Sequence, residues 1–220
     1  MKTIFKVSII ALASMPVLAS AQIYLYIPSA QDHFDVSGQG GGGPFNAEIL
    51  SGPSKTVIGT ETMFCDSIPQ EFYLGQTFEV TVERFNSSTN TSLDPWVITH
   101  AGSEASSFDA ANNVTLSQKQ INSAIQGVIW SIDGQTTGTI TSSDAGTASF
   151  ANYLLSDAHS KGTFNVGGYA RFDAGPNYAN GNGVFGQSQI GMAPVPEPAS
   201  LLALGLPVAG LAFRKRRTSK

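Results

Sequence analysis

The chain is poor in cysteine: its 220 residues contain one, Cys65, in the stretch MFCDSI at residues 63–68. A disulfide needs two thiols, so none can form within one copy of the chain, and packing alone must hold the fold together. A free cysteine is most often buried as a small hydrophobe, although redox and metal-binding uses of a thiol also occur. This thiol therefore needs a partner elsewhere in the sequence before a function can be assigned to it.

Positive charge is also scarce in most of the chain. Seven of the 12 lysines and arginines lie in the first six and the last seven residues. The segment 22–193 keeps the other five against 15 acidic residues, which gives it a net charge of −10. We expect no nucleic-acid partner, because contacts to phosphates need a basic face. An acidic, lysine-poor body is typical of a solvated extracellular protein.

Familiar catalytic and metal-binding patterns are missing. The three histidines, His33, His100 and His159, fall on separate predicted elements and form no metal motif. The stretch GQSQI at residues 186–190 lacks the second glycine of a nucleophile elbow. The glycine-rich stretch 38–44 ends in a proline where a dinucleotide-binding helix would begin. We expect no metal, no cofactor and no catalytic residue, and therefore a protein that is not an enzyme.

The N-terminus has the three parts of a secretory signal. Lys2 and Lys6 form a short positive region, and residues 7–18 are mainly apolar. Ala19 and Ala21 then flank a serine in the small-x-small pattern that signal peptidase cleaves. The apolar run is shorter than the roughly 20 residues that span a bilayer. We predict a signal peptide at residues 1–21 and an exported body at residues 22–193.

The C-terminus combines a proline-rich triplet, an apolar segment and a basic cluster. Residues 199–213 are uncharged and mostly apolar, and the basic cluster that follows holds its end of such a segment in the cytoplasm. Two glycines and a proline interrupt the segment, which suits a transient insertion in the inner membrane better than a lasting anchor. The residues that flank it are Pro196, Glu197 and Pro198 before it and Arg214, Lys215, Arg216 and Arg217 after it.

This arrangement resembles the PEP-CTERM sorting signal, with its Pro-Glu-Pro triplet, hydrophobic helix and terminal arginine and lysine cluster. The resemblance covers residues 194–220 and implies recognition by an exosortase, a membrane-embedded protease of Gram-negative bacteria that make extracellular polysaccharide. It also implies that the tail is removed and that the body reaches the cell surface or the extracellular matrix. An ordinary C-terminal membrane anchor is the alternative.

The sequence of the exported body predicts an α+β domain, which is mostly an antiparallel β-sandwich-like sheet with two inserted helices. The C-terminal sorting helix follows this domain. The strands of the domain are expected at residues 23–27, 47–50, 56–64, 76–85, 163–172 and 184–190. The first is rich in aromatic and β-branched residues, and in 76–85 apolar residues alternate with polar ones. Its helices are expected at residues 117–130, which begin with the capping box of Ser117 and Gln120, and at residues 144–158.

A possible partner for the thiol lies on the first of these helices. Phe64 and Cys65, together with the stretch IQGVIW at residues 125–130, resemble the two motifs of bacterial thioester domains. The resemblance implies that the Cys65 thiol condenses with the Gln126 carboxamide, releases ammonia and leaves an internal thioester that a partner amine can attack. Phe64 and Trp130 would shield the bond from water.

Two alternatives stay open for these residues. Only 61 positions separate Cys65 from Gln126, whereas thioester domains usually carry a longer, partly helical insertion there, and both residues can also be ordinary core. We expect an exported protein with a structural or adhesive role, with exopolysaccharide or surface amines as partners. A covalent thioester adhesin and a secreted polysaccharide-modifying enzyme are kept as the alternatives.

Overall fold

The structure is a computed structural model that describes residues 22–30, 35–37, 39–40, 44–66, 74–85, 93–161, 168–174 and 188–193. The predicted signal peptide, the sorting helix at residues 199–213 and parts of the last two expected strands lie outside the described residues. The described elements include both strands and helices, so the predicted α+β class is confirmed.

Six strands form a closed barrel in which all neighbouring strands are antiparallel. In spatial order these are β1 (Ile23–Ala30), β4 (Phe45–Ser51), β5 (Thr56–Cys65), β8 (Gln189–Met192), β7 (Tyr169–Asp173) and β6 (Thr77–Arg84). A short pair, β2 (Asp35–Val36) and β3 (Gln39–Gly40), lies apart from the barrel sheet. The sandwich-like sheet expected from the sequence is therefore corrected to a barrel, because β1 pairs with both β4 and β6 and so joins the two ends of the sheet.

Apolar and polar residues alternate along β6, so that one face of this strand is buried and the other is exposed. On β6, Phe78 and Val80 are buried, whereas Glu79 and Thr81 are exposed. This confirms the alternation expected for that strand. Alternation separates inward from outward residues, but it is the same for a sandwich and for a barrel.

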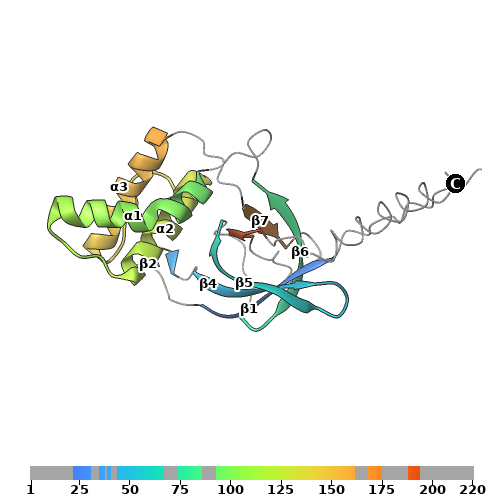
Figure 1. Cartoon of the computed structure of the whole chain (residues 1–220). Coiled ribbons are helices and arrows are strands. Elements are labelled where there is room, and N and C mark those ends of the chain that lie inside the picture. The colour runs from blue at the N-terminus through green and yellow to red at the C-terminus, as the bar shows by residue number, and fades with distance from the viewer. Residues whose placement is uncertain are drawn as a thin grey trace, which may run out of the picture.

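Three helices gather on one side of the barrel (Figure 1). They are α1 (Asp94–Asn112), α2 (Gln118–Ile132) and α3 (Ala145–Lys161). The helix α2 begins at the predicted capping box: the Gln120 N–H donates to Ser117 Oγ, and the Ser117 N–H donates to Gln120 Oε1. The positions of α2 and α3 were predicted, but the number of helices was not, because α1 was missed.

The sequence of α1 contains few of the local features that predict a helix. Its N-cap residue, Leu93, makes no side-chain capping bond. Beyond the first turn its buried residues are Ala101 and Ala105, which contribute little apolar surface to a periodic pattern. The helix is stabilised instead by its first turn, where Trp96 and Val97 enter the core.

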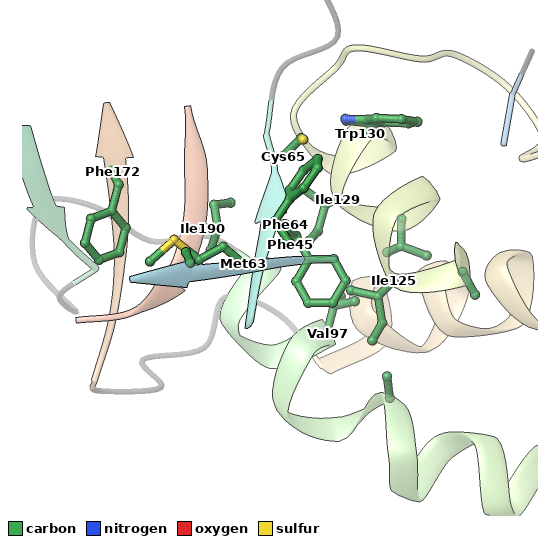
Figure 2. Close-up of a cluster of buried hydrophobic side chains, with 14 of the residues drawn as sticks. Phe45, Met63, Phe64, Cys65, Val97, Ile125, Ile129, Trp130, Phe172 and Ile190 are labelled. Atoms are coloured by element: carbon green, nitrogen blue, oxygen red, sulfur yellow. The ribbon is translucent and has the colours of Figure 1, made fainter. Parts of the chain in front are cut away.

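The central position of α2 buries more than one face of that helix. All residues from 123 to 130 are buried, because α2 packs against α1, α3 and the strands β2 and β5. Gly127 permits the approach to β2: a Cβ atom there would lie 2.5 Å from Val36 Cγ1. Figure 2 shows Phe64, Ile125 and Ile129 gathered where β5 meets the helices. The polar Gln126 is thus carried into the core between barrel and helices.

Candidate functional site

Cys65 is the last residue of β5 and lies directly opposite Gln189 of β8. The next main-chain N–H, that of Asp66, donates to the carbonyl oxygen of Ser188 at 3.2 Å. In an antiparallel pair, successive residues turn their main-chain groups to opposite sides of the strand. The N–H and C=O of Cys65 therefore point away from β8, toward the side where the pairing of β5 with β4 has ended at Met63.

The side chain of Gln126 occupies that side of the strand. The Cys65 N–H donates to Gln126 Oε1 at 3.0 Å, and Gln126 Nε2 donates to the Cys65 carbonyl oxygen at 2.6 Å. Both residues are fully buried. The carboxamide thus pairs with one strand residue as a neighbouring strand would, and it provides hydrogen-bond partners for two buried main-chain groups. The structure brings together the two residues that the sequence motifs singled out.

The aromatic residues of the two motifs are buried in the same region. Phe64 is 3% exposed and Trp130 is 2% exposed. Trp130 follows Gln126 by four residues and so lies one helical turn further along α2. In Figure 2, Phe64 and Trp130 both lie where β5 meets α2, near Cys65. Water is therefore kept away from the Cys65 and Gln126 pair.

A polar side chain that was not predicted contacts the thiol of Cys65. Gln189 Nε2 lies 3.7 Å from Cys65 Sγ, within hydrogen-bonding range for sulfur, and Gln189 is fully buried. In the sequence this residue belongs to the stretch GQSQI, which was compared only with a hydrolase motif. Its place opposite Cys65 depends on the register of β5 against β8, and no local pattern carries that register.

An arginine joins the strand that carries Cys65 to the helix that carries Gln126. Arg171, on β7, forms an ion pair through Nε with Asp66 Oδ2, and its Nη2 lies 3.5 Å from Asp133 Oδ1. Asp66 directly follows Cys65, and Asp133 is the C-cap residue of α2. The guanidinium therefore holds the end of β5 and the end of α2 together.

Burial governs the protonation of the two carboxyl groups. It raises the pKa of Asp66 above its usual range, and the Arg171 guanidinium opposes this increase. Burial also raises the pKa of Asp133, to about 6, again opposed by Arg171, while the charge of Asp66 adds to the increase. Ionisation of Asp133 at neutral pH therefore costs folding free energy.

The free energy of unfolding is expected to rise as the pH falls from 7 to 5. The pKa of Asp133 is about 6 in the folded protein and about 3.9 in an unfolded chain, so the folded state binds this proton more tightly. We expect a gain of about 1 kcal/mol, after allowance for the partial exposure of Asp133 to solvent. The measurement is the urea midpoint at each pH for the parent and for Asp133→Asn. An equal pH dependence in the two proteins would contradict the assignment.

A surface groove of about 550 Å³ lies beside the buried pair, between β5 and the helices α1 and α2. Phe64 and Ile125, the neighbours of Cys65 and Gln126 in the chain, both line it. Ile98 and Asn122 form part of its helical walls. Because Phe64 and Cys65 are consecutive on β5, the groove lies on the face of the strand that carries Phe64, and the Cys65 side chain turns to the opposite face.

A second groove, of about 380 Å³, bears on the polysaccharide-modifying alternative because Glu48 and Glu61 both line it. Glu48 lies opposite Thr60, and Glu61 lies opposite Ala47. Because Thr60 and Glu61 are consecutive, strand alternation directs the two carboxylates to opposite faces of the sheet. They therefore do not face one another across a cleft, as glycoside cleavage would require.

The two histidines among the described residues lie on different helices. His100 stacks on Trp96 within α1, His159 lies in the last turn of α3, and His33 is outside the described residues. The described part of the chain contains no group of three or more histidine, cysteine, aspartate or glutamate residues placed to hold a metal ion. Among the same residues, no helix has the length and apolar character needed to cross a membrane.

Comparison with known proteins identifies one feature of the chain. The PEP-CTERM protein-sorting motif matches residues 194–217, which include the predicted Pro-Glu-Pro triplet and the basic cluster. No curated protein and no solved structure matches the chain. The chain therefore carries a sorting signal of exosortase substrates, which implies export and sorting to the cell surface.

Proposed function

We propose that this protein, once sorted by exosortase, is an adhesive component of the cell surface or of the exopolysaccharide matrix, and that it attaches covalently through a Cys65–Gln126 thioester. The observation that supports the thioester is the pair of hydrogen bonds between the Gln126 carboxamide and the main chain of Cys65. These bonds hold the amide against the same residue that carries the thiol. Because the two residues are already held together, little translational entropy is lost when the thiol and the amide react.

The condensation balances with the groups of this chain alone. Cys65 Sγ forms a bond to Gln126 Cδ, the bond from Cδ to Nε2 breaks, and the thiol proton leaves with the amide nitrogen as ammonia. During the attack, negative charge develops on Gln126 Oε1, which already accepts the Cys65 N–H. A main-chain N–H aimed at such an oxygen stabilises the tetrahedral intermediate.

The thioester would then serve as a protected acyl donor. Burial of Cys65, Gln126 and Phe64 keeps water from hydrolysing it. An amine that reaches the bond attacks Cδ, forms an amide with position 126 and returns the sulfur of Cys65 to a thiol. The adhesive bond is therefore covalent, and it needs no metal or cofactor.

A purely structural use of Gln126 is the competing explanation. Its carboxamide bonds to main-chain atoms, and those bonds would form with any residue at position 65. Under this explanation the thiol is a small buried hydrophobe, and the protein is a non-covalent structural or adhesive component. The two explanations differ in the mass of the protein.

The mature protein is expected to be lighter by one ammonia than the mass calculated from its sequence. Cys65→Ser keeps the main-chain bonds to Gln126 but removes the thiol, and Gln126→Glu keeps the size of the side chain but removes the amide nitrogen. Both variants should have their full calculated mass. Reaction with methylamine should raise the mass of the parent protein from the reduced value to the mass of a protein with an N-methyl amide at position 126. Intact mass spectrometry measures all of these.

A second outcome of the mass measurement would exclude the thioester. A parent protein of full calculated mass, whose Cys65 is quantitatively alkylated after unfolding, would rule out the thioester. The carboxamide of Gln126 would then be a structural connection between α2 and β5.

A further inference from the structure

We propose that Gln189 acts on the reacting sulfur: its side-chain N–H donates to Cys65 Sγ and stabilises the thiolate, both when the thioester forms and when an amine opens it. This inference deepens the proposed thioester function and rests on it for its biological meaning. The contact itself is a property of the folded protein, so it can be tested whether or not the thioester forms.

The geometry places Gln189 on the opposite side of Cys65 from Gln126. Gln189 is the cross-strand partner of Cys65 on β8, and its Nε2 lies 3.7 Å from Sγ. Gln126 instead approaches the main chain of Cys65 from the side that faces α2. Gln126 therefore presents its own carboxamide carbon, the electrophile, at Cys65, and Gln189 contacts the sulfur, the nucleophile.

The side chain of Gln189 is buried among the barrel strands. It lies in a row across three strands, between Cys65 of β5 and Phe172 of β7, and all three side chains are fully buried. A leucine or methionine would fill such a place without the cost of removing an amide from water. The bond from Gln189 Nε2 to Cys65 Sγ offsets part of this cost, and it offsets more when the sulfur is charged.

The sulfur carries charge in both directions of the reaction. It attacks Gln126 Cδ as a thiolate, because the thiolate is the nucleophilic form of cysteine. When an amine opens the thioester, the bond from sulfur to Cδ breaks and the sulfur leaves with the electron pair. A proton released by the amine then returns it to the thiol. A donated N–H bond to an ionised partner is stronger than one to a neutral partner, so Gln189 favours the charged sulfur at both steps.

The test compares the parent with Gln189→Met, which keeps the length of the side chain and removes the donor. Gln118→Met, at the exposed start of α2, is the matched control. Each protein is first treated with methylamine, which frees the thiol if a thioester is present and changes nothing otherwise. The thiolate of Cys65 is then titrated by its ultraviolet absorbance. Circular dichroism and thermal unfolding verify that each variant is folded.

Gln189→Met is expected to lower the acid dissociation constant of the Cys65 thiol about tenfold, as the loss of a hydrogen bond to a charged group predicts. If the parent carries the thioester, its opening by methylamine at pH 7.5 should also slow about tenfold in the variant. Gln118→Met should leave the titration curve of the Cys65 thiol unchanged. Equal titration curves for the parent and Gln189→Met would overturn the inference. A full-mass parent with different curves would refute the thioester and leave the role of Gln189 at the sulfur intact.

Discussion

Replacement of Arg171 by methionine is expected to lower the free energy of unfolding by about 2 kcal/mol at pH 7, less than the removal of one partner of a fully buried ion pair, because the Arg171 side chain is 28% exposed. Arg171 is the cation between Asp66 and Asp133, and Asp66 is 6% exposed. Methionine fills most of the volume but leaves two partly desolvated carboxylates facing one another. Urea unfolding followed by circular dichroism measures the loss.

The pH dependence of this loss identifies its cause. Without the guanidinium, the pKa values of Asp66 and Asp133 should rise further, because Arg171 now lowers both. The folded state of Arg171→Met therefore binds protons more tightly, and the variant should regain stability as the pH falls from 7 to 5. Addition of Asp133→Asn should restore part of the loss at pH 7. Arg84→Met, at the exposed end of β6, is the matched control and should cost less than about 1 kcal/mol.

A loss below about 1 kcal/mol in Arg171→Met would contradict the prediction, because it would be no larger than the effect of an exposed ion pair. A loss that does not depend on pH would also contradict it. In that case the methionine would act through packing and not through the two carboxyl groups.

Gln126→Leu is expected to have a somewhat larger effect, about 3 kcal/mol, through the main chain of Cys65. Leucine has nearly the same volume, but it offers neither a donor nor an acceptor. The N–H and C=O of Cys65 would each lose a partner in the core, at a cost of about 1–3 kcal/mol for each group. The end of β5 and the middle of α2 would then be free to separate.

The comparison is made in a Cys65→Ser background, so that a thioester cannot contribute to the difference. Gln118→Leu in the same background is the control for a glutamine-to-leucine change on α2, and it should change stability by less than about 0.5 kcal/mol. Gln126→Glu keeps one acceptor for the Cys65 N–H and should become more stable relative to the parent at low pH, where its carboxyl group is protonated and can donate to the Cys65 carbonyl. Equal stability of Gln126→Leu and its parent would show that the two hydrogen bonds contribute nothing to the fold.

Local signals were enough for the elements that carry the site. The capping box of Ser117 and Gln120 placed the start of α2 within one residue, because a capping box is made by residues three apart in the chain. Alternation placed β6, again from residues close together in the chain. The helix α1 was missed because its buried residues beyond the first turn are alanines, which give no clear apolar pattern. Its stability depends on contacts of Trp96 and Val97 with distant parts of the chain.

The site could be predicted only in part. Two short motifs singled out Cys65 and Gln126, and the structure places them in contact. The atoms through which they meet were not predictable, because the Gln126 amide pairs with the main chain of Cys65 at a point where β4 no longer accompanies β5. Gln189 and Arg171 were missed entirely, since each reaches the site across a strand pairing.

The sequence by itself determined the sorting signal at the C-terminus, the acidic character of the body and the α+β class. Each of these depends on composition or on residues close together in the chain. The tertiary structure decided that the sheet closes into a barrel and that residues 65, 126 and 189 meet in one buried place. These contacts depend on strand register and on the docking of α2 against the end of β5. Register and docking are set by the packing of the whole core, which no short stretch of sequence contains.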